Sequence, residues 1–221
     1  MTPLISVIMP VLNGSNYIRE ALGSLLDQDC RLQIIVVDDG SQDNTAEIAR
    51  EYGCTVLSHA SSQGPVAAKN TGLATAIGEY VLFLDHDDRM RVGALKALCA
   101  ALEDDPAASA VQAKVQDFKS PDCSDPTVLI RSEPYYGLFT GAILMRRRIF
   151  DTIGLFSTEQ AAGEIIDWTF RMRQYGLDVK KIDMVSADRR VHGSNFGRTR
   201  RNEEFKDFAA ILRARIAGKA K

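Results

Sequence analysis

Three carboxylates stand within four residues at the end of an apolar run. Val81–Leu84 has the length and composition of a buried strand, and Asp85, Asp87 and Asp88 follow it directly. Carboxylates about 4–5 Å apart repel by roughly 3–4 kcal/mol per pair at an effective dielectric constant of about 20. Mg²⁺ and Mn²⁺ could neutralise them, because both prefer oxygen ligands and Mg²⁺ commonly shares carboxylates with substrate phosphates. The spacing therefore indicates divalent-metal chemistry on a phosphate-containing substrate.

The same acidic run also has an ordinary structural interpretation. Asp88 could cap a helix that begins near Met90, where the helix dipole favours a negative charge. The two interpretations differ in what else should lie nearby. A chemical site needs further polar groups brought to the same place by other elements of the fold.

The N-terminal half alternates strand and helix patterns. We expect strands at 4–9, 32–37, 54–58 and 80–84, and helices at 15–28, 44–52, 66–77 and 91–103. Ser15, and Asp43 or Asn44, are the expected helix caps. Continuous apolar strands between amphipathic helices predict an α/β fold: a Rossmann-like, mostly parallel sheet flanked by helices.

Polar clusters follow three of these strands. Residues 10–13, 38–41 and 85–88 come after the first, second and fourth strands. Ligands of such sheets bind beyond the carboxyl ends of the strands. We therefore expect all three clusters on one rim, which favours the chemical interpretation of the acidic run.

The second half has a less regular pattern. Residues 115–136 are polar and rich in Pro and Asp, and we interpret them as an insertion or mobile loop over the rim, with a weak strand signal at 127–130. The remaining expected elements are a strand at 141–145, helices at 147–153 and 163–175 closed by Gly154 and Gly176, one or two strands within 178–192, and a basic amphipathic helix from Asn202.

Composition narrows the function classes. A net charge of −2 does not favour nucleic acid as a partner. No apolar run reaches the roughly 20 residues of a membrane span, and the N-terminus lacks a signal-peptide pattern. Four scattered cysteines predict reduced thiols, so we expect a cytoplasmic protein. The basic C-terminal helix leaves open a peripheral contact with the inner face of a membrane, and a homodimer also stays open.

Four segments in order resemble a known family: SVIMPVLNGSNYI (6–18), VVDDGSQDNT (36–45), GPVAAKNTGLATAIGEYVLFLDHDD (64–88) and GEIIDWTFRMRQYG (163–176). Over about residues 4–192 the chain resembles the inverting family 2 glycosyltransferases of GT-A fold. The resemblance implies a single domain over 1–221, with a nucleotide-sugar-binding half (1–105), an acceptor and catalytic half (106–195) and the basic helix (196–221). It implies sugar transfer from a nucleotide-diphosphate donor with Mn²⁺ or Mg²⁺.

The resemblance also implies site residues. It assigns the donor to Pro10, Val11, Asn13, Asp39, Gly64, Lys69, Asn70, Asp85 and His86. Asp38 is the more structural member of its pair, His86 is expected to point away from its neighbours, and Lys69 could instead be a solvated helix lysine.

The implied metal ligands are Asp87 and Asp85 of the family's DxD motif, together with His192. For His192 the alternative is a hydrogen-bonded structural role. The neighbouring Arg189 and Arg190 could contact phosphates.

The general base is the point of departure from the family. Aligned on Arg171, the chain has Ile165 where the family usually has an aspartate, and isoleucine accepts no proton. The candidates for the base are Asp167, slightly favoured, and Glu164. Asp167 could instead pair with Arg171, and Glu164 could be an ordinary helix-start carboxylate. Trp168 could stack on a sugar or pack in the core.

The leading hypothesis is a metal-dependent inverting glycosyltransferase that uses a UDP-sugar, uridine being favoured by family frequency alone. Its acceptor is unknown; a cell-surface glycan, a lipid-linked precursor or a peptide are the candidates. Because of Ile165, the main alternative is a non-catalytic nucleotide-sugar-binding module or regulatory subunit. A sugar-phosphate nucleotidyltransferase is a weaker alternative, since the N-terminal region lacks a strong Gly-rich signature.

Overall fold

The computed structural model describes residues 2–137, 139–158, 164–193 and 195. Its strands are β1 (Leu4–Val11), β2 (Arg31–Asp38), β3 (Thr55–Ser58), β4 (Tyr80–Phe83), β5 (Arg89–Met90), β6 (Ala110–Lys119), β7 (Ile143–Arg146) and β8 (Val179–Val191). Its helices are α1 (Ile18–Leu26), α2 (Thr45–Glu51), α3 (Pro65–Thr75), α4 (Ala94–Glu103), α5 (Ile149–Ile153) and α6 (Glu164–Gln174), with a 3₁₀ turn η1 (Thr140–Ala142) before β7.

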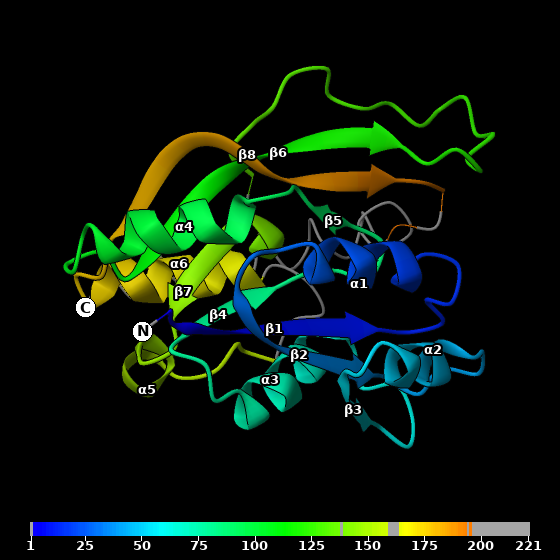
Figure 1. Ribbon diagram of the computed structural model, residues 1–221, viewed down its shortest axis with the longest axis horizontal. Coiled ribbons are helices and arrows are strands. Elements are labelled where there is room, and N and C mark those ends of the chain that lie inside the picture. Colours follow the sequence, from blue (N-terminus) through cyan, green and yellow to red (C-terminus); the bar gives the residue numbers. More distant parts are fainter. Residues whose placement is uncertain (1, 138, 159–163, 194, 196–221) are drawn as a thin grey trace, which may run out of the picture.

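The strands form one sheet in the order β3-β2-β1-β4-β7-β6-β8-β5 (Figure 1). Its N-terminal part is parallel, because β1 pairs with both β2 and β4, and β2 with β3. Its second part is mixed: β7 is antiparallel to β4 and β6, whereas β8 is parallel to β6 and antiparallel to β5. The expected α/β fold is confirmed, and the antiparallel pairs belong to the later strands.

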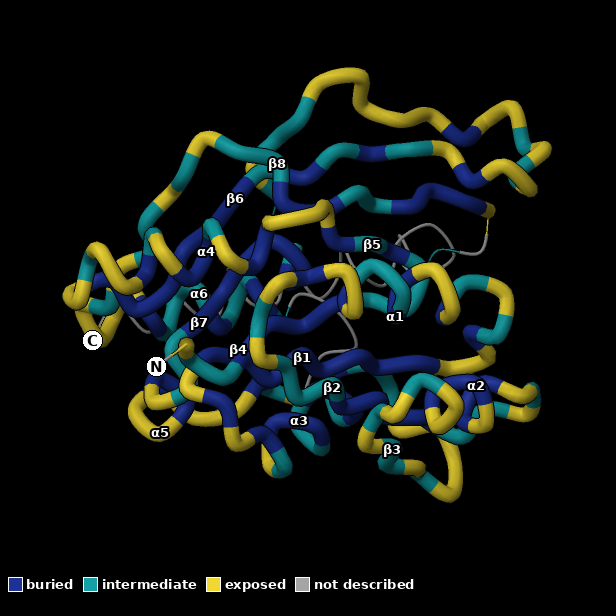
Figure 2. The backbone as a smooth tube through the Cα atoms, in the orientation of Figure 1, coloured by how far each residue is buried: buried dark blue, intermediate teal, exposed yellow. Residues whose placement is uncertain are grey.

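Helices cover both faces of the sheet, as the alternation of β1 requires. Ile5, Val7 and Met9 point to one face and pack with α1, α2 and α4, whereas Ile8 points to the other face. The second face is covered by α3, α5 and α6. Because each face buries its own apolar layer, the central strands are buried along most of their length, as Figure 2 shows for β1 and β4.

One glycine allows α3 to approach the sheet closely. A Cβ atom on Gly72 would lie 2.4 Å from Ile8 Cγ2 and 3.1 Å from Val37 Cγ2. Any larger residue would therefore push the helix away from β1 and β2. The N-terminus of α3, which begins at Pro65 after Gly64, is placed at the rim by this contact.

The expectation of a loop over 115–136 is wrong at its start. Residues 115–119 continue β6, which pairs with β8 as far as Lys119. Val115 and Asp117 are buried between less buried neighbours, so the segment follows the two-residue period of a strand with one covered face. Its polar residues obscured that period. The chain beyond Ser120 is mostly exposed until Tyr135 (Figure 2).

Two of the expected helix caps are also wrong. α1 begins after Tyr17 without a side-chain cap, since the Gly14 carbonyl accepts from the amides of Tyr17 and Ile18. Asp88 does not cap a helix, because Arg89 and Met90 form β5. Gly154 and Gly176 have positive φ after α5 and α6, as expected. The predicted helix from Asn202 lies outside the described residues.

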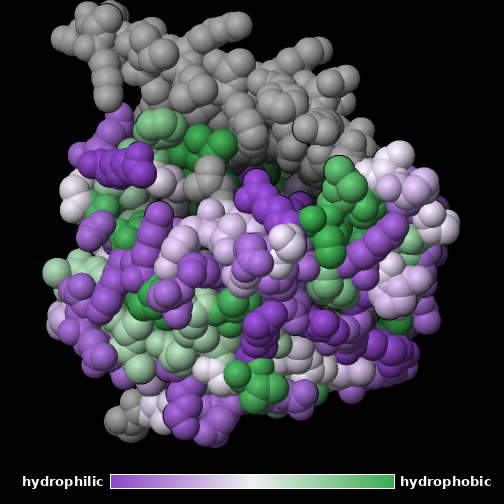
Figure 3. All heavy atoms as spheres, turned by 90° about the horizontal axis from the view of Figure 1, so that it is seen from above, coloured by the Kyte–Doolittle hydropathy of each residue, from purple (hydrophilic) through white to green (hydrophobic). Residues whose placement is uncertain are grey.

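No helix within the described ranges is both long and apolar enough to cross a bilayer. In the face shown in Figure 3, apolar side chains occur in small patches separated by hydrophilic ones.

Candidate functional site

The three polar clusters meet at one rim, as the sequence predicted. Asn13, in a left-handed conformation with φ 52°, donates its backbone N–H to Ser41 Oγ at 2.8 Å. Its side-chain oxygen accepts from the Gln42 amide at 2.8 Å, which ties the loop after β1 to the loop after β2. The ring of His86 lies against Gly14, where an added Cβ would stand 2.5 Å from the ring carbon Cδ2. The acidic turn (residues 85–88) therefore lies at the same rim.

Asp39 anchors the loop that leads into α3. Its carboxylate accepts hydrogen bonds from the amides of Gln63 and Gly64, both at 2.9 Å, and from Ser62 Oγ at 2.7 Å. The His59 Nδ1 atom lies 2.6 Å away. Burial by itself would raise the pKa of Asp39, but these hydrogen bonds outweigh it and hold the pKa below its usual value.

Asp38 is buried and accepts from the Ser41 amide at 2.9 Å, so it closes the turn after β2. Asp38, which was expected to be the more structural of the two, does hold this turn. The Asp39 carboxylate also accepts hydrogen bonds from protein groups. The backbone of Val11 contributes to the same corner by accepting from the Asp39 amide at 2.8 Å.

Arg190 fixes the acidic turn through hydrogen bonds to Asp88 and Asp87. The backbone amide of Arg190 donates to Asp88 Oδ1 at 2.7 Å, and its Nε donates to the Asp87 carbonyl at 2.9 Å. The buried guanidinium also pairs with Glu20 and lies over the rings of Tyr17 and Phe118, at 4.9 and 4.6 Å from their centroids. The idea that Arg190 contacts phosphates is therefore wrong, because its side chain is committed inside the protein.

Asp88 has a structural position. It is buried, and burial together with the negative charges of Asp87 and Asp85 raises its pKa well above the usual value. Arg189 is also engaged: its Nη1 lies 3.6 Å from Asp117 Oδ1 and 3.3 Å from the Tyr135 hydroxyl.

Asp87 and His192 meet across the rim. His192 Nε2 lies 3.0 Å from Asp87 Oδ2, and Asn195 Nδ2 donates to the same oxygen at 3.0 Å. Burial favours the neutral form of Asp87, but the hydrogen bond from His192 and the nearby imidazoles lower its pKa. The carboxylate is thus kept anionic beside a potential nitrogen ligand.

The donor set of this pair fits a divalent cation. Within the described ranges, no three His, Cys, Asp or Glu side chains converge on a common metal position. Mg²⁺ seldom requires such a cage, because it is usually bound through one or two carboxylates with substrate phosphates and water. Asp87 offers a carboxylate and His192 an imidazole at the same point. The remaining ligands would come from a bound substrate.

A buried ion pair crosses the site between α3 and α6. Lys69 Nζ donates to Glu164 Oε1 at 2.6 Å, with only 7% and 14% of the two side chains exposed. Burial would raise the pKa of Glu164, and the Lys69 charge lowers it instead. Asp85 lies within the field of the same lysine, yet burial keeps its pKa raised. The alternative of a solvated Lys69 is wrong.

Other predicted residues make structural contacts. Asn70 bonds the backbone of Phe156 with both ends of its amide, at 2.9 and 3.1 Å. Asp167 accepts from Arg171 Nε at 2.8 Å, which is the i, i+4 pairing considered from the sequence. Ile165 is buried in the core beside Trp168, which is 1% exposed and packs against Phe150 and Phe156.

Sequence reasoning singled out Arg190 only as a possible phosphate contact and not as the support of the acidic turn, and it missed the pair of Tyr17 and Asp122. Tyr17 donates its hydroxyl to Asp122 Oδ2 at 2.8 Å across 105 residues of sequence. No local pattern marks such a pair. The alternation within β8 could have indicated that Arg190 and His192 point to the same side of the strand.

Comparison with solved structures places the fold. A mannosyltransferase from Pyrobaculum calidifontis, solved with GDP-Man and Mn²⁺, matches with a TM-score of 0.74 at 21% identity, over 96% of this chain and 65% of that one. The S. aureus TarS fragment 1–349 with UDP-GlcNAc matches with a TM-score of 0.67 at 25% identity, over 86% and 59%. The structure has the fold of these GT-A glycosyltransferases.

Curated relatives share the sequence as well. The glycosyltransferase GlyG of Streptococcus pneumoniae is 34% identical over 201 residues, which is 88% of this chain and 61% of GlyG. An uncharacterized glycosyltransferase of Rickettsia typhi is 45% identical over 89 residues, which is 39% of this chain and 28% of that protein. The chain therefore spans less than two thirds of each of these two relatives.

A family model described as Glycosyl transferase family 2 matches residues 6–156. That range holds most of β1, all of β2 to β7 and the three rim clusters, of which the acidic turn is one. Because it covers well over half of the 221 residues, the chain belongs to glycosyl transferase family 2.

Proposed function

We propose that this chain catalyses metal-dependent, inverting transfer of a sugar from a nucleotide-diphosphate donor. The observation that carries the proposal is the Asp87–His192 pair, at 3.0 Å, at the carboxyl edge of a parallel sheet. Ligands of α/β sheets bind at this edge. The Mn²⁺ and nucleotide sugars bound by the GT-A neighbours support the same chemistry.

The donor occupies the rim in this proposal. Its nucleoside lies by Pro10, Val11 and Asn13, and the Asp39-anchored loop before Gly64 shapes that end of the site. Asp85, with His86 beside it, faces the ribose and diphosphate. Lys69 supplies the positive charge nearest the phosphates, at the first turns of α3.

Asp87, Asp85 and His192 would hold Mn²⁺ or Mg²⁺. The bound cation would offset the negative charge that develops on the departing nucleotide diphosphate. Asp88 and Arg190 keep these ligands in place, because they connect the acidic turn to the end of β8.

Glu164 is the base in this proposal, and its pair with Lys69 would have to open or shift when the acceptor binds. The sequence slightly favoured Asp167. However, Arg171 pairs with Asp167 and also donates to the Leu155 carbonyl at 2.7 Å, so the Asp167 carboxylate helps to hold α6 against the segment after α5. Glu164 lies in the cluster with Lys69 and Asp85. It would accept the acceptor's hydroxyl proton while the oxygen bonds to the anomeric carbon and the bond to the diphosphate breaks.

Uridine is the proposed base of the donor. The TarS fragment, which was solved with UDP-GlcNAc, supports it, and so does the family frequency of UDP-sugars. Asn70 shapes the donor site indirectly, since it fixes the backbone of Phe156 beside α3.

Donor turnover tests the proposal. With Mn²⁺ and a panel of nucleotide sugars, we expect slow donor hydrolysis and faster transfer when acceptors are added, with both abolished by EDTA. Asp87→Asn should reduce turnover by about 10²-fold or more, because it removes a charged metal ligand. Asp29→Asn is the matched control, since Asp29 is 89% exposed and pairs only with Lys96 among its described contacts. Equal turnover in the two variants would refute the role of Asp87.

The competing function is a nucleotide-sugar-binding module without activity. The buried Ile165 favours it, because the helix offers no acid at the family's usual position. Calorimetric titration with UDP and Mn²⁺ separates the two functions. Tight binding without turnover of any donor, across many acceptors, would establish the module.

A further inference from the structure

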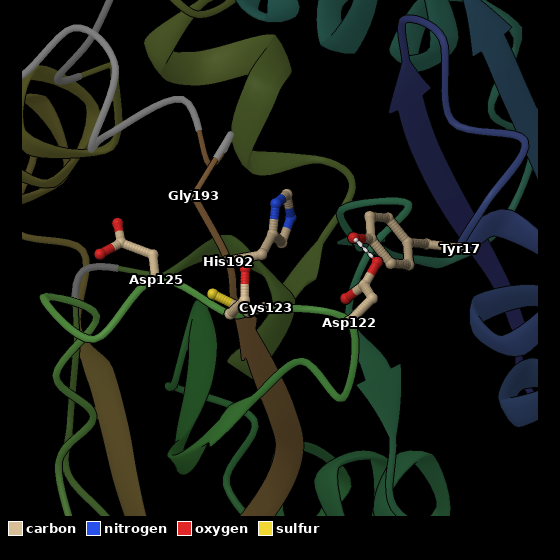
Figure 4. A pocket seen from close by; sticks show the side chains of 7 residues that line it. Tyr17, Asp122, Cys123, Asp125, His192 and Gly193 are labelled. Carbon is tan, nitrogen blue, oxygen red and sulfur yellow. Dashed lines mark hydrogen bonds between the residues drawn. The ribbon is translucent and has the colours of Figure 1, made fainter.

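A pocket of about 290 Å³ is lined in part by His192, the residue that contacts Asp87. Its lining residues are Tyr17, Asp122, Cys123, Ser124, Asp125, His192 and Gly193. They come from the loop before α1, the segment after β6 and the end of β8. Figure 4 shows Tyr17 and Asp122 meeting at one side, Asp125 at the other, and His192 and Cys123 between them.

The pocket shares a wall with the proposed metal site. The His192 ring stands 4.9 Å from the Tyr17 ring, centroid to centroid, while its Nε2 lies 3.0 Å from Asp87 Oδ2. A group bound in the pocket would therefore contact the same imidazole that the proposed metal site uses.

The lining determines which ligand chemistry fits. Asp122 and Asp125 contribute carboxylates, and Tyr17 and Ser124 contribute hydroxyls. No lysine or arginine is among the described lining residues; Lys119 reaches the Asp125 carbonyl at 2.8 Å, and Arg190 is buried beneath Tyr17. The two carboxylates accept hydrogen bonds from ligand hydroxyls and repel anionic groups that come close to them.

We propose that this pocket is the acceptor subsite and that it takes a sugar unit without anionic substituents. Tyr17 and Asp122 determine its specificity: the Asp122 carboxylate accepts from acceptor hydroxyls, and the Tyr17 phenol holds that carboxylate in place. The volume suits a single sugar-sized group. This inference rests on the proposed glycosyl transfer and adds the class of the acceptor.

Cys123 provides a direct readout of occupancy. It lines the pocket, whereas Cys30, Cys54 and Cys99 are not among the lining residues. Alkylation with iodoacetamide, followed by peptide mass spectrometry, therefore measures Cys123 with Cys30 and Cys54 as internal controls. The whole chain is used, with UDP and Mn²⁺ present, and no turnover is needed.

The probes are neutral oligosaccharides of several types, such as maltotetraose, chitotetraose and mannotetraose, and their sulfated counterparts. We expect at least one neutral probe to slow Cys123 alkylation about fivefold at about four times its Kd, with Cys30 and Cys54 unaffected. The sulfated counterpart should give no protection. Protection by sulfated probes alone, or by none of the probes, overturns the proposal.

Two variants test the specificity pair. Asp122→Asn should weaken protection about tenfold, since a charged acceptor of hydrogen bonds is lost, and Tyr17→Phe should weaken it less. Asp183→Asn, which alters an 84% exposed carboxylate in β8, is the control. Unchanged protection in Asp122→Asn contradicts the assignment. Absence of donor turnover with Cys123 still protected would instead refute the proposed function and leave a sugar-binding site.

Discussion

At the residue scale, Ile165 departs from the family pattern for a packing reason. It is buried with Trp168 and Met172 on the inner face of α6, at spacings of three and seven residues. A carboxylate there would face apolar side chains without a partner. Isoleucine at position 165 therefore contributes to the packing of α6 on the sheet.

We predict that Ile165→Asp will not restore a family-type base. An unpaired carboxyl in this core should lower the free energy of unfolding by about 3 kcal/mol or more. Chemical denaturation and donor-turnover assays measure the two effects. Ile165→Val is the control, with an expected cost of about 1 kcal/mol. Raised activity in a stable Ile165→Asp variant would show that this position reaches the acceptor.

Asp39 gives a pH-dependent prediction. Its folded pKa lies below its usual value of 3.8, so its contribution to stability is complete above that pH and is lost as the pH falls through the folded pKa. Asp39→Asn removes this contribution. We expect a cost of about 1–3 kcal/mol at pH 6 that shrinks below pH 4. Urea unfolding across this pH range tests it, and a cost that does not depend on pH would be inconsistent with an anionic anchor.

At the element scale, Gly72 allows α3 to pack closely on β1 and β2. Gly72→Ala should destabilise the protein by about 1–3 kcal/mol, because the new methyl group would overlap Ile8. Gly23→Ala in α1 is the matched control. Nothing lies within 4 Å of an added Cβ there, so it should stabilise by about 0.5–1 kcal/mol. Thermal unfolding measures both, and equal effects would refute the close-packing argument.

At the same scale, β8 delivers two groups to the site. Arg190 and His192 are two residues apart at its end and project to the same side, one beneath the acidic turn and one beside it. The parallel pairing of β8 with β6 continues to Val191, directly before His192. The sheet therefore sets the position of the histidine relative to Asp87.

At the scale of the whole molecule, we propose that the two halves form one cooperative unit. The N-terminal half (1–105) contains β4, which pairs with β7 of the second half, and both core layers continue across that boundary. Calorimetry should show a single transition with equal calorimetric and van't Hoff enthalpies. A fragment of 1–105 should not fold alone, since β4 would lose β7 and become an exposed, apolar edge strand. Two separate transitions would contradict this proposal.

The sequence alone determined the alternation of strands and helices, the shared rim, the acidic turn and the family. These features are local: apolar periodicity marks each element, and the polar clusters directly follow their strands. They required no knowledge of which distant segments meet. Local patterns failed at β6, where polar side chains led to the prediction of a loop from residue 115 although the strand continues to Lys119.

Only the tertiary structure decided which carboxylates are committed to partners inside the protein. Lys69 and Glu164 are 95 residues apart, and Asp88 and Arg190 are 102 apart. A carboxylate near the rim is a ligand, a base or an anchor according to the cation or amide that packs against it. That partner is fixed by the sheet order β4-β7-β6-β8, which no local pattern specifies, and the pocket beside His192 is determined in the same way.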